Sequence, residues 1–283
     1  MDSPLRFGII GYPIVHTLSP LMHETAFRAL GIDATYEAIE VHPQSLRYRL
    51  RELIEEEHYS GLNVTIPHKE TVVRLLDEMT KEAAQVGAVN TITVKDGAKI
   101  GTNTDVFGLG KVLEQYKDRI AGNEVILLGT GGGARAAAVW LLNHAHPDLL
   151  RIVTRHIPRA EKFIASFKPI AGNTVLRRTA TTGNIKRFVE SAVLVINATP
   201  VGMSPKTDAS PLDDTVRFRE GQIVFDLIYR PRETTLLRRA KDDGATAVGG
   251  LEMLLWQGAQ AFEMWTGKTM PVEVVRKKIE EAL

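Results

Sequence analysis

The sequence of 283 residues contains no cysteine, which excludes disulfides, thiolate nucleophiles and cysteine-ligated metal sites. Only histidines and carboxylates remain as metal ligands, and the eight histidines show no metal-binding spacing, so we expect no metal site. The 35 basic and 34 acidic side chains leave a net charge of +1, which provides no overall field to hold nucleic acid or an anionic membrane. Any anionic ligand must be bound locally.

Long apolar runs are also missing, since no stretch approaches the roughly 18 to 20 residues that span a bilayer. The N-terminal segment, residues 1–6, lacks the basic-then-apolar order of a signal peptide. These absences predict a cytoplasmic protein with no membrane and no nucleic acid among its partners.

Hydrophobic residues make up 44% of the chain and charged residues 24%, an ordinary globular composition, and the length suffices for two domains. In the first part of the chain, short apolar runs alternate with stretches of helical period, which predicts a mostly parallel sheet covered by helices. The predicted strands are residues 5–10, 35–41 and 61–65, and the predicted helices are residues 20–30 and 44–57. Two further strands, 89–94 and 99–102, flank an Asp-Gly turn and predict an antiparallel edge hairpin.

A second alternating series follows, with strands predicted at residues 124–128, 151–154, 174–176, 192–196 and 222–225. The tail differs, because residues 250–265 and 271–283 have the pattern of two helices that would pack back on the first domain. The fold class is therefore α/β with two domains. One is formed by residues 1–104 and 250–283 around a mostly parallel mixed sheet, and the other by residues 105–249.

A glycine-rich turn joins the strand at 124–128 to a helical stretch that begins at residue 135. In this strand-to-helix context it fits G-x-G-x-x-[G/A], with Gly129, Gly131, Gly132, Gly133 and Ala134. Glycines let the backbone turn tightly and approach a pyrophosphate, and the positive end of the helix attracts its charge. The turn predicts a Rossmann-like dinucleotide-binding domain; the alternative is a plain glycine-rich βα turn.

The end of the second strand of this domain indicates which dinucleotide binds. A site for NAD usually has an acidic residue there, about 20 residues after the glycines, whereas this sequence has Thr154, with Arg155 and Arg159 close by. A planar guanidinium suits a 2′-phosphate, so these residues favour NADP. The alternative is that the two arginines are a solvated helix start.

Four polar segments lie where strands meet loops in the N-terminal half, and open α/β sheets bind ligands at the carboxyl ends of their strands. They predict a pocket for a polyhydroxylated molecule. The segments are residues 12–20, 63–69, 87–91 and 101–105.

These segments, together with the glycine-rich turn, Asn197-Ala198-Thr199-Pro200-Val201-Gly202-Met203, residues 226–231 and residues 250–257, resemble the shikimate dehydrogenase family in order and spacing, over about residues 7 to 267. The resemblance implies NADPH-dependent, reversible reduction of 3-dehydroshikimate to shikimate in aromatic amino acid biosynthesis, and a small-molecule substrate. It also implies that the first domain is the substrate-binding catalytic domain and that the second binds NADP. The resemblance leaves open whether the protein is a monomer or a homodimer.

By the same resemblance, Lys69 and Asp105 form the catalytic pair. Oxidation of an alcohol needs a group that removes the hydroxyl proton as hydride departs, and returns it in reduction. Burial and neighbouring cations lower the pKa of a lysine, whereas a close carboxylate raises it. Asp105 is therefore expected to orient Lys69 and the substrate, and which of the two carries the proton stays open. The alternatives are a solvated turn for Lys69 and a helix cap for Asp105.

The family binds the substrate carboxylate through two hydroxyl side chains in a Ser-x-Ser-Pro arrangement, where this chain has Thr17 and Ser19. Threonine keeps the hydroxyl but adds a stiffening methyl group. The resemblance also implies substrate contacts from Thr65, Asn90, Tyr229 and Gln257, and cofactor contacts from Thr199, Met203, Ile228 and Gly250. As alternatives, Ser19 would be only a helix N-cap, and Asn90, Asn103 and Thr65 would only bridge backbone groups in turns.

Two other functions remain open at this point. The first is a quinate/shikimate dehydrogenase that uses NAD(P), which Thr17 favours and the missing acidic residue after the second strand opposes. The second is a ligand-sensing regulator without turnover, which the presence of both Lys69 and Asp105 opposes.

Overall fold

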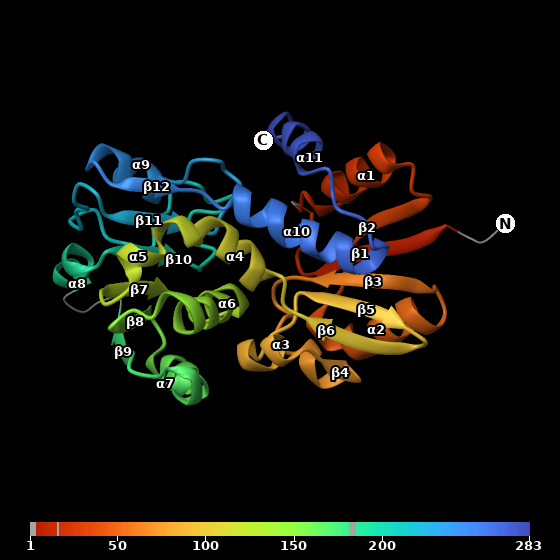
Figure 1. Ribbon diagram of the computed structural model, residues 1–283, viewed down its shortest axis with the longest axis horizontal. Helices are drawn as coiled ribbons and strands as arrows, with labels where there is room; N and C mark the ends of the chain where they lie inside the picture. The colour runs from red at the N-terminus through yellow and green to blue at the C-terminus, as the bar shows by residue number, and fades with distance from the viewer. Residues whose placement is uncertain (1–3, 16, 181–184) are drawn as a thin grey trace. The chain divides into compact units, whose positions relative to one another are not determined.

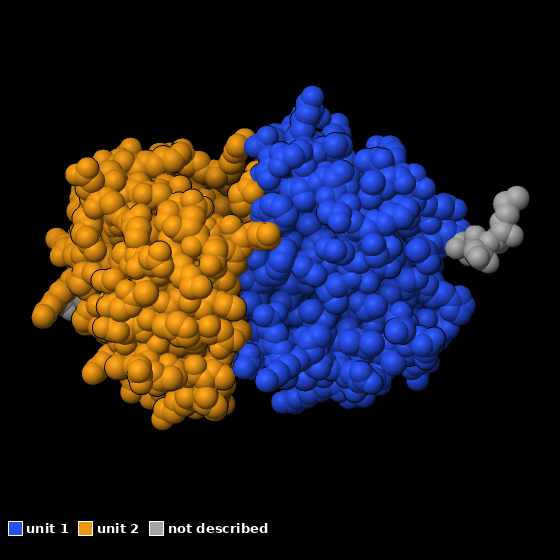
Figure 2. Space-filling view, viewed as in Figure 1, with its two compact units in different colours: residues 1–108, 255–283 blue, residues 109–254 orange. Residues whose placement is uncertain are grey.

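The computed structural model describes residues 4–15, 17–180 and 185–283, so the first three residues of the N-terminal segment discussed above lie outside it. The chain forms two compact units, residues 1–108 with 255–283 and residues 109–254 (Figure 2). No helix in the described part of the chain is long and apolar enough to cross a membrane.

Unit 1 is built on a six-stranded sheet in the order β2-β1-β3-β5-β6-β4 (Figure 1). Its strands are β1 (Leu5–Gly11), β2 (Ala34–Glu40), β3 (Tyr59–Val64), β4 (Glu78–Met79), β5 (Thr91–Lys95) and β6 (Ala98–Thr102). Its helical segments are α1 (Ser19–Leu30), η1 (Pro43–Ser45), α2 (Leu46–Glu55), η2 (Val72–Leu75), α3 (Lys81–Val86), most of α10 (Leu251–Thr266) and α11 (Val272–Glu280).

The predicted hairpin is present, because β5 pairs antiparallel with both β3 and β6. Its expected position at the sheet edge is wrong, since the two-residue strand β4 pairs in parallel with β6 on the outer side. The mostly parallel mixed sheet is confirmed. Strand β1 pairs in parallel with its neighbours β2 and β3.

The two faces of this sheet have different cores, because successive side chains of a strand point to opposite faces. One face carries an aliphatic cluster in which Ile10 and Leu62 pack with Leu50 and Leu53 of α2. The other face carries an aromatic cluster in which Phe7, from β1, stacks with Phe27 of α1 and with Trp265 of α10. The C-terminal helix α10 therefore packs on the first sheet, as the sequence predicts.

Gly61 in β3 is required by this packing. A Cβ atom at this position would lie 2.4 Å from Nε1 of Trp265, whose N–H donates to the carbonyl oxygen of Ile92 at 3.1 Å. The indole thus lies directly on the backbone of the sheet and ties α10 to β5.

Unit 2 has six strands, all paired in parallel, in the order β12-β11-β10-β7-β8-β9. This is the doubly wound order of dinucleotide-binding domains, which confirms the Rossmann-like prediction. The strands are β7 (Glu124–Leu128), β8 (Leu149–Thr154), β9 (Val175–Ala180), β10 (Leu194–Asn197), β11 (Ile223–Asp226) and β12 (Thr246–Val248). Central strands are nearly all apolar because helices cover both faces of a parallel sheet.

The helical segments of unit 2 are most of α4 (Asp105–Leu113), η3 (Glu114–Tyr116), α5 (Lys117–Ile120), α6 (Gly132–Trp140), the π-helical η4 (Leu141–Ala145), α7 (Ile157–Phe167), η5 (Lys168–Ile170), α8 (Ile185–Ser191) and α9 (Thr235–Asp242). Val195 and Val224 of the central strands pack with Val189 of α8 and Leu236 of α9 in the apolar cluster on one face.

The aromatic cluster of unit 1 includes the imidazole ring of His23 in α1. It is fully buried, stacks on Tyr36 at a ring-centroid distance of 4.3 Å, and contacts the rings of Phe27, Phe262 and Trp265. Neither ring nitrogen has a hydrogen-bond partner among the described residues. Burial without compensation disfavours the charged imidazolium and lowers the pKa of His23 to about 3.

We therefore expect stability to fall in mild acid. Below the ordinary histidine pKa of about 6.5, His23 is protonated in the unfolded chain. In the folded chain it stays neutral until the pH falls to about 3. This group alone should lower the unfolding free energy by about 2 kcal/mol between about pH 7 and about pH 5. His23→Phe should remove that part of the pH dependence in denaturant unfolding. The exposed His144, changed to Gln, is the control, and identical pH slopes for His23→Phe and the unaltered protein would contradict the assignment.

Candidate active site

A lysine and an aspartate form a mostly buried ion pair in unit 1. Nζ of Lys69 donates to Oδ2 of Asp105 at 2.6 Å, and the two side chains are 18% and 5% exposed. Lys69 lies in the turn between β3 and η2, where its carbonyl oxygen accepts from the N–H of Val89 at 2.8 Å. Asp105 is the first residue of α4. The structure thus brings the two predicted catalytic residues together, although they are distant in sequence.

Asn90 fixes the orientation of this pair through its contact with Asp105. Its Nδ2 donates to Oδ1 of Asp105 at 2.8 Å and to Oγ1 of Thr104 at 2.9 Å, and it lies 3.3 Å from Oε1 of Gln257. Its Oδ1 accepts from the backbone N–H of Thr104 at 2.7 Å. Asn90 is only 2% exposed, so it binds side chains from two segments and does more than bridge a turn.

The hydrogen-bond network continues from Asn90 to further residues, to which the sequence analysis assigned no role. The hydroxyl of Thr91 contacts Oδ1 of Asn90 and the hydroxyl of Thr104, each at 3.1 Å. Nδ2 of Asn63 donates to Thr91 Oγ1 at 3.1 Å, and its Oδ1 accepts from the hydroxyl of Tyr36 at 2.6 Å. The only signal in the sequence was that Asn63, Thr91 and Thr104 belong to the polar segments at strand ends.

The sheet explains why these segments meet. Asn63 near the end of β3 is paired with Thr91 at the start of β5, and Thr91 is paired with Thr102 at the end of β6. The polar residues just beyond these positions therefore lie together at the same ends of the neighbouring strands. Asn103 differs, since it is 1% exposed and donates to the carbonyl oxygen of Ala88 at 2.8 Å, which is the backbone-bridging alternative.

The two hydroxyl residues predicted for a carboxylate contact each other. Oγ1 of Thr17 lies 3.2 Å from Oγ of Ser19 and accepts from the N–H of Ser19 at 3.2 Å. Ser19 is 4% exposed and is the first residue of α1, whose N-cap is Leu18 with no side-chain cap, so the alternative of Ser19 as N-cap is wrong. Thr65 follows β3, and its N–H donates to the carbonyl oxygen of Ile10, at the end of β1, at 2.9 Å.

In unit 2 the glycine-rich turn has the geometry that a dinucleotide needs. Gly129 follows β7 with φ of 106°, and a Cβ there would lie 3.0 Å from the carbonyl oxygen of Ala198. Gly131 is the N-cap of α6, and space beside it is open, with no atom within 4 Å of an added Cβ. Gly132, Gly133 and Ala134 are the first residues of the helix, so their backbone amides belong to its positive end and have no partner within the helix. These residues fit a bound pyrophosphate.

The predicted 2′-phosphate residues lie in the turn after β8. Thr154 ends the strand, and its hydroxyl accepts from the N–H of His156 at 3.1 Å. His156 then caps α7 through Nδ1, which accepts from the N–H of Arg159 at 3.1 Å. Arg155 and Arg159 are both exposed, and Arg155 precedes the helix. Two exposed arginines therefore lie beside the end of β8.

The remaining predicted contacts of unit 2 lie in two loops that follow β10 and β11. Oδ1 of Asn197 accepts from the N–H and hydroxyl of Thr199, at 3.0 and 2.7 Å, and thereby shapes the loop that leads to Met203. Ile228 is buried, and its carbonyl oxygen accepts from the N–H of Gly250 at 3.1 Å. A Cβ at Gly250 would lie 2.2 Å from the carbonyl oxygen of Leu227, so only glycine fits. Tyr229 follows Ile228 in the same loop.

Asp226, the last residue of β11, is a buried carboxyl to which sequence reasoning also assigned no role. Burial raises its pKa to about 6, although hydrogen bonds from Thr234, the N–H of Ile228 and Asn197 oppose the shift. It is completely inaccessible to solvent.

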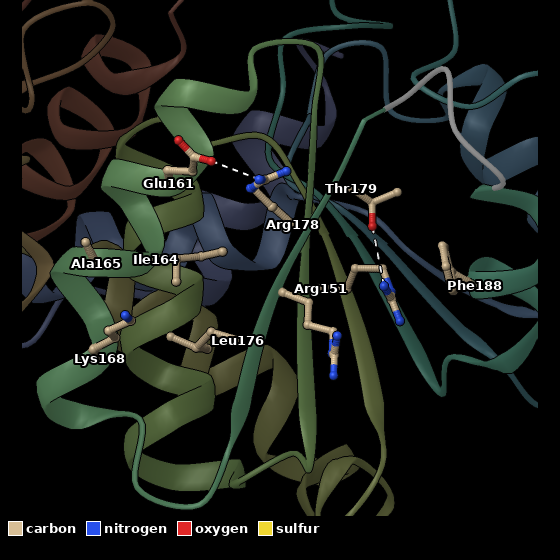
Figure 3. Close-up of a pocket in the computed structure, with 10 residues that line it drawn as sticks. Arg151, Glu161, Ile164, Ala165, Lys168, Leu176, Arg178, Thr179 and Phe188 are labelled. Atoms are coloured by element: carbon tan, nitrogen blue, oxygen red, sulfur yellow. Dashed lines mark hydrogen bonds and ion pairs between the residues drawn. The ribbon is translucent and has the colours of Figure 1, made fainter.

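The pocket drawn in Figure 3 is separate from all of these residues. It has a volume of about 620 Å³ and lies around β9. Arg151 in its wall is paired with Glu124 at 2.6 Å and stacks on Phe188. Arg178 is paired with Glu161 at 2.9 Å (Figure 3). The guanidinium groups of Arg151 and Arg178 therefore have partners within the fold. Among the described residues, no three histidine or carboxylate side chains gather as a metal site would require.

An oxidoreductase that uses a pyridine dinucleotide needs a cradle for the dinucleotide and a proton-transferring group for the alcohol. The glycine-rich turn of unit 2 has a geometry that fits the first, and the Lys69–Asp105 pair of unit 1 has the chemistry that the second requires, which is the pattern of this class of enzyme.

Comparisons with known proteins identify the family. Residues 9–92 match the family model of the shikimate dehydrogenase substrate binding domain, and residues 250–280 match that of the shikimate 5′-dehydrogenase C-terminal domain. A shikimate dehydrogenase (NADP(+)) of Symbiobacterium thermophilum is 42% identical over 278 residues, which cover 98% of this chain and 94% of that protein. The chain belongs to the shikimate dehydrogenase family.

Solved structures agree in fold. Shikimate 5-dehydrogenase from Thermus thermophilus, solved in complex with NADP(H) and shikimate, has a TM-score of 0.85 and 35% identity, with 99% of this chain and 100% of that chain covered. Quinate dehydrogenase from Corynebacterium glutamicum, solved in complex with NAD, has a TM-score of 0.87 and 29% identity, with 99% of this chain and 100% of that chain covered.

Proposed function

We propose that this protein catalyses the reversible, NADPH-dependent reduction of 3-dehydroshikimate to shikimate. The observation that carries the proposal is the Lys69–Asp105 ion pair, oriented by Asn90, in a chain that is 42% identical to a shikimate dehydrogenase (NADP(+)). The predicted domain of residues 1–104 with 250–283 is proposed to bind the substrate, with Asp105 at its boundary completing the catalytic pair, and residues 105–249 are proposed to bind NADP. The two compact units support this division.

Lys69 is the group that we propose to transfer the proton. Both oxygens of Asp105 are already engaged, Oδ2 by Lys69 and Oδ1 by Asn90, and the Asp105 side chain is only 5% exposed. The Lys69 ammonium has three N–H donors, of which Asp105 takes one, and its side chain is more exposed at 18%. Lys69 can therefore direct a second N–H to the oxygen that alternates between carbonyl and hydroxyl, while Asp105 stabilises the ammonium and fixes its direction.

The substrate carboxylate is assigned to the two hydroxyls of Thr17 and Ser19, which lie together at the first turn of α1. The positive end of this helix favours an anion there. Asn90, Gln257 and Thr65 are proposed to contact the ring hydroxyls, because amide and hydroxyl side chains both donate and accept. Tyr229 is proposed as a further contact from the loop after β11.

NADPH supplies the hydride when bound. The proposed pyrophosphate site is the turn with Gly129, Gly131, Gly132, Gly133 and Ala134, and the 2′-phosphate would lie on Arg155 and Arg159 next to Thr154. Thr199, Met203, Ile228 and Gly250 are assigned to the nicotinamide side. A cytoplasmic location and a monomeric or homodimeric state stay predictions.

A second candidate function is a quinate/shikimate dehydrogenase that uses NAD(P). The resemblance to the Corynebacterium glutamicum quinate dehydrogenase and the extra methyl group of Thr17 favour it. The exposed Arg155 and Arg159, with Thr154 in place of an acidic residue, argue for NADP. The regulator alternative is disfavoured, since a protein without turnover has no need of the Lys69–Asp105 pair.

Initial rates on shikimate and on quinate, each with NADP and with NAD, test this proposal. We expect fast nicotinamide reduction with shikimate and NADP, and much slower rates in the other three reactions. Quinate or NAD rates of similar size would favour the second candidate. Binding of both ligands without turnover would overturn the enzymatic proposal altogether.

Arg155→Ala tests the cofactor assignment. It should raise the KM for NADP by about tenfold because it removes a charge-assisted contact to the 2′-phosphate, and it should leave the KM for NAD unchanged. Steady-state rates with the two cofactors measure both values. Arg187→Ala removes another exposed arginine of unit 2 and serves as the control. Equal losses for NADP and NAD would contradict a role of Arg155 at the 2′-phosphate.

A further inference from the structure

Three segments of unit 2 meet at the carboxylate of Asp226. Its Oδ1 accepts from Nδ2 of Asn197 at 3.0 Å and from the backbone N–H of Ile228 at 3.1 Å. Its Oδ2 accepts from the hydroxyl of Thr234 at 2.7 Å. One side chain thus joins the end of β10, the loop after β11 and the start of α9.

Two of these segments contain residues assigned above to the cofactor, and the third is the start of α9. Asn197 is paired with Asp226 in the sheet, and its other contacts hold Thr199 and reach the carbonyl oxygen of Val201 at 3.4 Å. Ile228 is itself an assigned contact, and its carbonyl oxygen accepts from Gly250. Thr234 is the N-cap of α9, where its hydroxyl also accepts from the N–H of Leu237.

The loop after β10 is further constrained at Gly202. This residue has φ of 99°, and a Cβ there would lie 3.0 Å from the carbonyl oxygen of Ala209 and 3.8 Å from both Ile228 and Thr234. The two loops also contact each other directly, since the N–H of Ser204 donates to the carbonyl oxygen of Arg230 at 3.1 Å. A change in the hydrogen bonds of Asp226 would therefore shift the loop after β10 and the loop after β11 together.

A completely buried carboxylate is unfavourable unless donors compensate for its lost hydration. A simple structural link between β10 and β11 would not need one, since the strands already pair along four positions. We infer that Asp226 is a positioning residue that sets the two loops for the nicotinamide half of NADP, and that the adenine half binds independently of it. This inference rests on the proposed cofactor assignment.

The adenine half is assigned to residues that follow β8, which is not a neighbour of β10 or β11 in the sheet. Arg155 follows β8, which is separated from β11 by β7 and β10. A ligand that lacks the nicotinamide, such as 2′,5′-ADP, should therefore report on Arg155 without sensing Asp226. This difference separates positioning of the nicotinamide loops from a general loss of structure.

The test measures dissociation constants of NADPH, by its fluorescence, and of 2′,5′-ADP, by calorimetry. Asp226→Asn keeps the size of the side chain but removes its charge and replaces one of its two acceptor oxygens with an NH2 donor, so it should weaken NADPH binding by about fivefold. Asp226→Ala removes every acceptor and should weaken it by more than about tenfold. Both variants should bind 2′,5′-ADP as the unaltered protein does.

Gln222→Met is the matched control, because Gln222 is a buried polar residue directly before the opposite end of β11, where its Nε2 donates to the carbonyl oxygens of Val189 and Ala192. It should leave both affinities unchanged. If Asp226→Ala does not fold, Asp226→Asn alone decides the question.

NADPH affinity within about twofold of normal in Asp226→Asn, or a parallel loss of 2′,5′-ADP binding, would overturn the inference alone. Absence of NADPH binding by the unaltered protein would overturn the cofactor assignment, and this inference with it.

Discussion

The hydrogen bond from the buried amide of Asn90 to Asp105 is the constraint on which the candidate site depends. It occupies one carboxylate oxygen and directs the other at Lys69, 2.6 Å away. Without a donor at Oδ1, a carboxylate that is only 5% exposed would be left partly unsatisfied, which is unfavourable in a low-dielectric interior. Asn90 is in turn fixed by Thr91 and Thr104, so the direction of the lysine ammonium is set by the sheet itself.

The two units stabilise a buried aspartate in a similar way. In each, an asparagine at a strand end contacts a buried aspartate from another segment, Asn90 with Asp105 in unit 1 and Asn197 with Asp226 in unit 2. In each unit, the pair lies at the carboxyl ends of the parallel strands, where polar loops begin. This is the usual ligand side of an open α/β sheet. The first pair fixes the Lys69 ammonium that we propose to face the substrate, and the second holds loops that we propose for the cofactor.

Sequence patterns predicted the strands other than β4 and β12, the Rossmann-like domain and the packing of α10 on the first sheet, because burial of apolar runs and the glycine-rich turn are local signals. They misplaced the hairpin at an edge, since a two-residue strand such as β4 has no periodicity to detect. Asn63, Thr91 and Asp226 were missed as parts of networks because their partners are set by strand register. His23 looked polar in sequence, yet its helix places it in an aromatic core.

The most direct test of the central claim is the turnover of Lys69→Met, compared with Lys99→Met, which removes the lysine of a more exposed ion pair with Asp77. Rates of 3-dehydroshikimate reduction at saturating NADPH should fall by about 10² to 10⁴ in Lys69→Met, the usual worth of a proton-transferring group, with NADPH binding unchanged. Lys99→Met should keep its rate. A Lys69→Met rate within about tenfold of normal would contradict proton transfer by Lys69 and the role assigned to its pair with Asp105.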